Sequence, residues 1–158
     1  MEILYDNIYE LEIECTTLCN ASCPLCYRNY KSFLTSPYSK PLIRDFNSVI
    51  EQLNKLKNLN YVMLVGSMSE PTLYPKFIEL VKYLKNRNIK IEICTNGDTH
   101  NSDFWKELAM QLSDDDEIYF TICGSTQELH EQYRKNTCLK NILTNANAVR
   151  QIRPIDYA

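Results

Sequence analysis

The chain has 158 residues, close to the usual length of one domain, so we expect a single domain over residues 1–158. Its 17 basic and 20 acidic residues give a net charge of -3, which excludes a general attraction to nucleic acid or to anionic membranes. The first residues, MEILYDNIYELEIE, are acidic where a secretory signal is basic, and no apolar run reaches the roughly 18 residues of a membrane span. We therefore expect a cytoplasmic protein without a membrane segment.

Apolar periodicity predicts strands that alternate with helices. In chain order, the predicted elements are a strand at 9–15, a helix at 45–59, a strand at 61–65, a helix with apolar residues at 77–84, a strand at 89–94, a helix at 102–112, a strand at 118–123 and a helical stretch at 127–150. Between the first strand and the first helix lies a long loop with no sustained period.

Local signals set the expected helix boundaries. Asp45 is the predicted N-cap of the first helix, and Asn101 or Ser102 that of the third. Pro75 is placed in the first turn of the second helix, where proline is tolerated. We expect the last helical stretch to break near Asn136.

Four strand-helix repeats of about thirty residues each predict an α/β fold with a parallel sheet and right-handed crossovers. The alternation by itself allows a doubly wound sheet or part of a (βα) barrel. In either case the loops that follow the strands meet at the carboxyl edge of the sheet. The segments with unusual residues all fall at that edge: CNASCPLC, GSMSEP, TNG and CGS.

Seven cysteines in a chain too long to need disulfide staples favour reduced thiols, some of them metal ligands. Four are scattered and are expected to be small core residues: Cys15, Cys94, Cys123 and Cys138.

The other three, Cys19, Cys23 and Cys26, form a C-x3-C-x2-C array on the loop after the first strand. Three thiolates on a short loop can hold three irons of a 4Fe-4S cluster and leave the fourth iron open to a ligand. The alternative is a zinc site with a distant fourth ligand, for which the sequence offers Cys15, His100 and His130. We favour the cluster, because the C-x2-C pairs typical of zinc ribbons are not repeated here.

These motifs occur in an order that resembles the radical S-adenosylmethionine (radical SAM) enzymes. CNASCPLCYR is similar to the family's cluster motif, although Leu25 stands where an aromatic residue usually precedes the last cysteine. Three later segments, GSMSEPTLYP (66–75), ICTNG (93–97) and FTICGSTQELHEQYR (120–134), resemble the family's GGEP, third-strand and SIDG segments. The resemblance covers about residues 9 to 150 and implies a partial TIM-like barrel, of which this chain holds about four of the usual six strand-helix units.

The resemblance also implies cofactors and a reaction. Cys19, Cys23 and Cys26 would ligate the 4Fe-4S cluster, whose fourth iron would be chelated by the amino and carboxylate groups of S-adenosylmethionine. An electron donor such as flavodoxin or ferredoxin would reduce the cluster. Reductive cleavage of S-adenosylmethionine then yields a 5'-deoxyadenosyl radical that abstracts hydrogen from a substrate. The substrate is unknown, although the TLYP and CGSTQELHEQYRKNT segments resemble members of the family that act on peptides or other macromolecules.

Six further residues match segments that contact S-adenosylmethionine in the family: Ser67, Met68, Ser69, Glu70, Thr121 and Arg134. Met68 and Ser69 stand where the family has two glycines, and Cys123 replaces its usual aspartate. Each assignment has a structural alternative. Glu70 can cap the following segment, Thr121 can satisfy a strand, and Arg134 can be a solvated helix residue.

The chain is short for this family, whose domains continue beyond four units. IRPIDYA (152–158) has the pattern of a beginning fifth strand, so we expect a truncated domain that lacks the later strands and exposes the edge of strand four. A second hypothesis for its function is therefore a non-catalytic interaction module that binds an iron-sulfur cluster or zinc.

Overall fold

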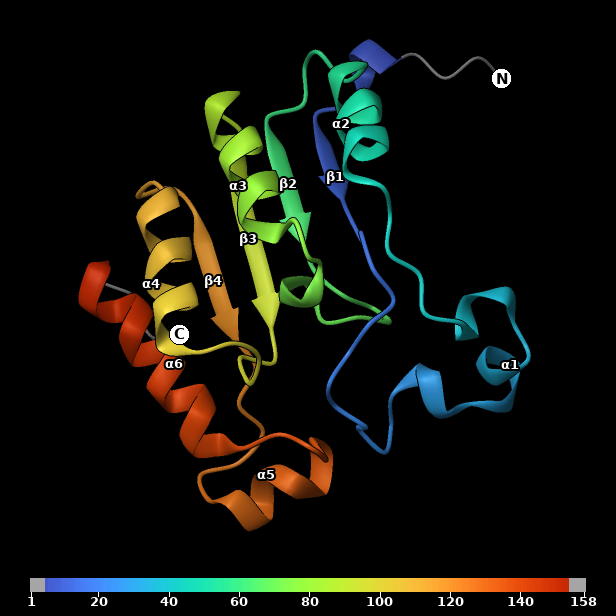
Figure 1. Ribbon diagram of the computed structural model, residues 1–158, viewed down its shortest axis with the longest axis vertical. Coiled ribbons are helices and arrows are strands. Elements are labelled where there is room, and N and C mark those ends of the chain that lie inside the picture. Colours follow the sequence, from blue (N-terminus) through green and yellow to red (C-terminus); the bar gives the residue numbers. More distant parts are fainter. Residues whose placement is uncertain (1–4, 154–158) are drawn as a thin grey trace.

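The computed structural model describes residues 5–153, without the side chains of Ser32, Phe33 and Tyr38. It contains one parallel sheet in the order β1-β2-β3-β4, as the repeats predicted (Figure 1). The strands are β1 (Glu10–Glu12), β2 (Tyr61–Leu64), β3 (Lys90–Thr95) and β4 (Glu117–Phe120). The α-helices are α1 (Lys31–Leu34), α2 (Phe46–Asn54), α3 (Phe77–Asn86), α4 (Ser102–Gln111), α5 (Gln127–Tyr133) and α6 (Leu139–Ile152). Short 3-10 turns are η1 (Tyr5–Asn7), η2 (Tyr27–Asn29), η3 (Pro37–Ser39) and η4 (Pro71–Leu73).

Most of the predicted helix starts are confirmed, whereas the first predicted helix ends at Asn54 and not at Leu59. The Asp45 carboxylate accepts from Ser48 N–H at 2.8 Å and caps α2, and Asn101 caps α4. Asn136 adopts a positive φ of 61° between α5 and α6, which is the predicted break. The prediction for Pro75 is wrong, because α3 begins at Phe77 with Lys76 as its N-cap and Pro75 lies in the preceding turn.

Two strands are shorter than predicted. The N–H of Ile13 donates to the Met63 carbonyl at 2.9 Å, but the chain then leaves β2, and the Cys15 carbonyl accepts from the N–H of Arg44 at 2.8 Å. At the other side of the sheet, β4 stops at Phe120 although the apolar pattern continues to Cys123. The predicted start of a fifth strand lies outside the described residues from residue 154 on, and Ile152 belongs to α6.

The two faces of the sheet differ in burial. Val62, Leu64, Ile91 and Ile93 are buried, and they face the helices in a core that includes Leu80, Leu84, Trp105 and Leu108. The alternate residues of the same strands are only partly buried: Tyr61, Met63, Lys90, Glu92 and Cys94. In Figure 1 the helices α2, α3 and α4 lie over one face, and α6 packs against α4. A sheet covered on one face in this way is a segment of a (βα) barrel and not the doubly wound alternative.

The uncovered face of the sheet is polar. Lys90 Nζ donates to Glu117 at 2.7 Å, and the hydroxyl of Tyr61 donates to Glu92 on the next strand. This face is therefore stabilised by cross-strand polar pairs rather than by apolar packing. In the described part of the chain, no helix is long and apolar enough to cross a membrane.

The amino edge of the sheet is held by one buried carboxylate. Asp116 accepts hydrogen bonds from the N–H groups of Ile91 and Ser113, each at 2.7 Å, and its side chain lies 2.7 Å from Lys85 Nζ. Burial opposes its negative charge, but these donors outweigh burial and lower the pKa of Asp116 below its ordinary value of 3.8.

Replacing Asp116 with alanine should lower the free energy of unfolding by about 2 to 4 kcal/mol, because it removes the carboxylate partner of Lys85 and leaves the buried N–H of Ile91 and the N–H of Ser113 without their acceptor. The exposed Asp114 is the matched control, and its alanine variant should change stability by less than about 0.5 kcal/mol. Chemical denaturation measures both. A carboxylate with a lowered folded pKa stabilises the protein only above its unfolded pKa, so the difference between wild type and Asp116→Ala should shrink as the pH falls below about 4. A constant difference down to pH 2.5 would contradict this assignment.

Candidate active site

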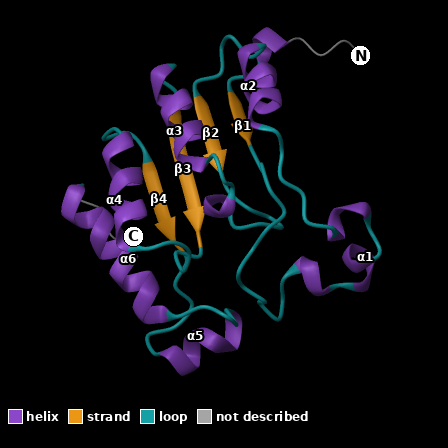
Figure 2. Cartoon of the chain, in the orientation of Figure 1, coloured by secondary structure: helices purple, strands orange, loops and turns teal. Residues whose placement is uncertain are grey.

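Four loops meet at the carboxyl edge of the sheet, as parallel topology requires. They follow β1, β2, β3 and β4 and contain the predicted site residues except Arg134, which lies at the end of α5. Figure 2 shows these loops at the arrowheads of the strands, with α5 beneath the end of β4.

The Glu70 carboxylate joins the second and third of these loops. Glu70 is 2% exposed and accepts from Thr95 Oγ1 at 2.6 Å, from the N–H of Asn96 at 2.7 Å and from Thr72 Oγ1 at 2.7 Å. Its own N–H donates to the Leu18 carbonyl in the cysteine loop at 2.7 Å. Glu70 also caps η4 through the N–H of Thr72, which is the capping role that the sequence left open. One buried residue therefore fixes three loops relative to one another.

Asn96 extends this network to the cysteine loop. Its Nδ2 donates to Asn20 Oδ1 at 2.8 Å and lies 3.9 Å from Cys19 Sγ, while Asn20 Nδ2 donates to the Asp98 carbonyl at 3.2 Å. Sequence reasoning missed both asparagines. The TNG turn marked the right place, but nothing near Asn20 in the sequence indicates its partner.

The three cysteines of the array lie on one turn-rich loop. The N–H of Cys26 donates to the Cys23 carbonyl at 3.0 Å, and Asn29 Nδ2 donates to the same carbonyl at 2.6 Å. All three thiols are partly exposed. Burial raises the pKa of Cys19, against the opposing effects of the Ala21 N–H and the Arg28 charge. Within residues 5–153, no three His, Cys, Asp or Glu side chains are arranged to hold a metal ion, so the thiols share a loop without converging on one point.

The three distant ligands considered for zinc are engaged elsewhere. Cys15 is buried in the core, and burial raises its pKa to about 11. His100 Nε2 donates to the Thr72 carbonyl at 2.7 Å and its ring stacks on Phe104. His130 is buried, with its Nε2 2.9 Å from Thr137 Oγ1. None of them is combined with the cysteine array in the described structure.

The segment that corresponds to GGEP makes a tight turn. A Cβ at Gly66 would lie 2.0 Å from the carbonyl oxygen of Ser69, so only glycine fits there. The N–H of Met68 donates to Glu14 at 2.8 Å, and Ser67 Oγ lies 3.5 Å from Glu12 Oε1. These two glutamates, at the end of β1 and just beyond it, were not among the predicted site residues.

Thr121 and Arg134 approach the site from the β4 side. The Thr121 hydroxyl donates to the Thr95 carbonyl at 2.9 Å, which is the strand-satisfying role named as its alternative. Arg134 follows α5, and its Nε donates to Cys123 Sγ at 3.3 Å. Burial opposes the Arg134 charge, but the thiols of Cys123, Cys23 and Cys19 raise the pKa of the guanidinium. Arg134 is therefore directed toward the cysteine loop and is not a freely solvated helix residue.

The residues present fit an iron-sulfur cluster and S-adenosylmethionine in their chemistry. The loop offers three thiols beside a guanidinium, which suits a negatively charged thiolate group. At the same edge, two buried oxygens, Ser69 Oγ and Asp98 Oδ1, have no hydrogen-bond partner in the described residues. Buried acceptors without partners are what a ligand with N–H or O–H donors would satisfy.

Comparisons with known proteins find a curated relative and solved structures of similar fold. A "Tungsten-containing aldehyde ferredoxin oxidoreductase cofactor-modifying protein" of Pyrococcus furiosus is 28% identical over 99 residues, which is 63% of this chain and 27% of that protein. Among solved structures, "Native anSMEcpe with bound AdoMet and Kp18Cys peptide" has a TM-score of 0.67 at 18% identity, covering 92% of this chain and 41% of that one. TYW1 with a lysine-pyruvate adduct bound has a TM-score of 0.61 at 14% identity, covering 96% of this chain and 57% of that one.

The two solved structures share the fold of this chain. The chain spans 27% of the length of the curated relative, and 41% and 57% of the lengths of the two solved structures. The family model described as "Radical SAM superfamily" matches residues 13–154, which include the cysteine array, the Glu70 turn and the Arg134 segment. The chain belongs to the radical SAM superfamily.

Proposed function

We propose that this chain is the cofactor-binding part of a radical SAM enzyme, with a 4Fe-4S cluster held by Cys19, Cys23 and Cys26. The observation that carries the proposal is the tie between the cysteine loop and the loops after β2 and β3, through Glu70 and Asn96. When bound, the cluster supplies the electron that cleaves S-adenosylmethionine to a 5'-deoxyadenosyl radical, which takes a hydrogen atom from substrate.

In this proposal, Glu70 does not contact the cofactor but holds the loops that form its binding site. Its carboxylate is buried and engaged by three side-chain or backbone donors of the loops. The turn formed by Ser67, Met68 and Ser69 then presents backbone carbonyls and Ser69 Oγ to the methionine amino group. The Glu12 and Glu14 carboxylates fix this turn through Ser67 and Met68.

Arg134 and Thr121 bind the carboxylate and the ribose of S-adenosylmethionine in this proposal. The Arg134 guanidinium, held at Nε by Cys123, presents its remaining N–H groups to the methionine carboxylate. The Thr121 hydroxyl donates a hydrogen bond to the Thr95 carbonyl, so its oxygen can still accept a hydrogen bond from a ribose hydroxyl.

For the substrate we propose a peptide or another macromolecule. The supports are the named peptide in one structural neighbour and the cofactor-modifying role in the name of the Pyrococcus furiosus relative. The uncovered polar face of the sheet is the surface on which such a substrate would lie. Seven free cysteines suit the reducing cytoplasm, where we place the protein.

The cluster is tested by replacing Cys23 with alanine. After anaerobic reconstitution, the wild-type chain should contain about four irons and four sulfides and be brown, whereas Cys23→Ala should lose most of both, because only two thiol ligands remain. Cys94→Ala is the matched control, since Cys94 lies on β3 outside the array, and it should keep the wild-type content. Zinc in place of iron in the wild-type protein would refute the proposed function, as would equal iron content in both variants.

The role of Glu70 is tested by Glu70→Gln. The NH2 group of the glutamine cannot accept the hydrogen bonds that Thr95 and Asn96 donate to the carboxylate, so one of these donors loses its acceptor. We therefore expect the free energy of unfolding to fall by about 1 to 3 kcal/mol. We also expect at least a tenfold weaker binding of S-adenosylmethionine, measured by equilibrium dialysis on the reconstituted protein. Glu79→Gln, on the exposed surface of α3, is the control. It loses only a surface ion pair with Lys76, so its stability should stay within about 0.5 kcal/mol of wild type and its binding of S-adenosylmethionine should be unchanged. Weaker binding at unchanged stability would contradict the positioning role and indicate direct contact with the cofactor.

A further inference from the structure

The segment between Glu14 and Asp45 contains no acidic residue, although the chain as a whole is acidic. It carries four basic residues, namely Arg28, Lys31, Lys40 and Arg44. Because the whole chain has a net charge of -3 and this segment has +4, the rest of the chain has -7. We call residues 19–44 the arm. It combines the three array cysteines with all of this local positive charge.

The arm projects from the rest of the molecule and exposes apolar side chains. In Figure 1, α1 and its neighbouring turns lie to the right, away from the sheet and its helices. Leu25 is 78% exposed, Leu34 is 61% exposed and Tyr30 is 53% exposed. Tyr30 stacks on Tyr27, which is also exposed, with 6.0 Å between ring centroids. Exposed apolar side chains gathered on one segment, with tyrosine and arginine among them, are typical of a protein interaction surface.

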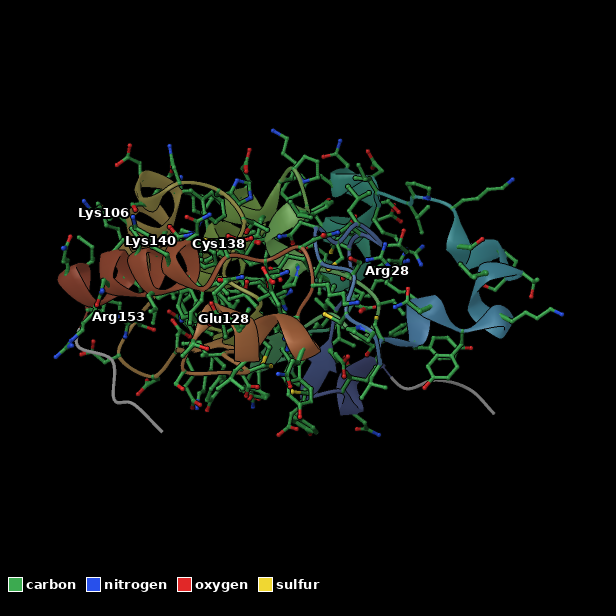
Figure 3. All side chains as sticks on the ribbon, turned by 90° about the horizontal axis from the view of Figure 1, so that it is seen from below. Arg28, Lys106, Glu128, Cys138, Lys140 and Arg153 are labelled. Atoms are coloured by element: carbon green, nitrogen blue, oxygen red, sulfur yellow. The ribbon has the colours of Figure 1, made fainter. Side chains whose placement is uncertain are left out.

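This surface adjoins the cysteine array directly. Asn29 donates from its N–H to the Cys26 carbonyl at 2.9 Å and from its side chain to the Cys23 carbonyl. Seen from the carboxyl edge, Arg28 lies across the molecule from Lys106 and Lys140 (Figure 3). A protein bound to the arm would therefore stand next to the three thiols.

We propose that the arm is the docking surface for an acidic one-electron donor protein. This inference rests on the proposed function, because a metal group held by the three thiols must receive electrons from outside. In each encounter the donor loses one electron and the metal group gains one, with no bond formed or broken. Electron-transfer encounters use small interfaces and depend on complementary charge for their association rate. A basic, partly aromatic arm on an otherwise acidic protein meets both requirements, and it directs an acidic partner away from the rest of the surface.

Two other acidic partners could bind to the basic arm. A second copy of this chain could place its acidic body against the arm, and an acidic peptide substrate could bind there. The first would make the chain self-associate as its concentration rises, and the second would bind without affecting electron delivery. The experiment has to distinguish both from a donor protein.

The direct test is the affinity for a flavodoxin at low ionic strength, which needs no cluster. The charge-reversal pair Lys31→Glu/Lys40→Glu changes two exposed arm residues, and Lys106→Glu/Lys140→Glu makes the same change of charge at the far side of the molecule. We expect the arm variant to bind on the order of tenfold more weakly and the control variant to stay within about twofold of wild type. The difference should fall as salt is added. Equal weakening in both variants, or no binding by wild type at low salt, would overturn the inference.

Electron delivery is measured on the reconstituted proteins with two reductants. Reduced flavodoxin should reduce the arm variant about tenfold more slowly than wild type. Photoreduced 5-deazariboflavin, a small neutral molecule, should reduce both at the same rate. Slow reduction by both reductants would show damage to the metal site rather than lost docking. Unchanged reduction by flavodoxin, or loss of a wild-type dimer in the arm variant, would assign the arm to a peptide or to a second copy and overturn the proposal.

Discussion

The arrangement of the site depends on one buried carboxylate. Glu70 has almost no contact with solvent, and a buried carboxylate is costly unless donors surround it. Its donors come from Thr72 in its own loop and from Thr95 and Asn96 at the end of β3, while its backbone N–H reaches the cysteine loop. Folding the chain so that Glu70 is satisfied therefore assembles three of the four loops. This requirement positions the start of the cysteine loop, through the Leu18 carbonyl that accepts from the N–H of Glu70.

The rest of the fold supports that edge without taking part in its chemistry. On the helical side, Val62, Ile91 and Ile93 are buried and hold β2 and β3 in register. At the amino edge, Asp116 satisfies the N–H of Ile91 and anchors the start of β3. The uncovered face carries polar pairs, which allows contact with a polar ligand or substrate. This separation of stability from function follows the general pattern of α/β folds, where the carboxyl edge carries the site.

The sequence predicted those parts of the structure that depend on local patterns. The apolar runs of β2 and β3 and the caps at Asp45 and Asn101 are signals within a few residues, and they predicted these strands and helix starts correctly. The strand ends were not predicted, because the chain leaves β2 after Ile13 and the Cys15 carbonyl bonds to the N–H of Arg44 instead. The partners of Glu70 at Thr95 and Asn96 lie 25 and 26 residues away, and Asn20 and Asn96 are 76 residues apart. The resemblance placed Glu70 in the site, but only the folded chain shows that its carboxylate faces the protein.

The central claim is that this loop assembly, despite its small size, activates S-adenosylmethionine. The most direct measurement is the release of 5'-deoxyadenosine from S-adenosylmethionine by the anaerobically reconstituted chain, with and without a reductant. We predict release that requires both the reductant and the intact cysteine array. A protein that holds the full cluster yet releases no 5'-deoxyadenosine under reducing conditions would contradict the claim and support a non-catalytic iron-sulfur module.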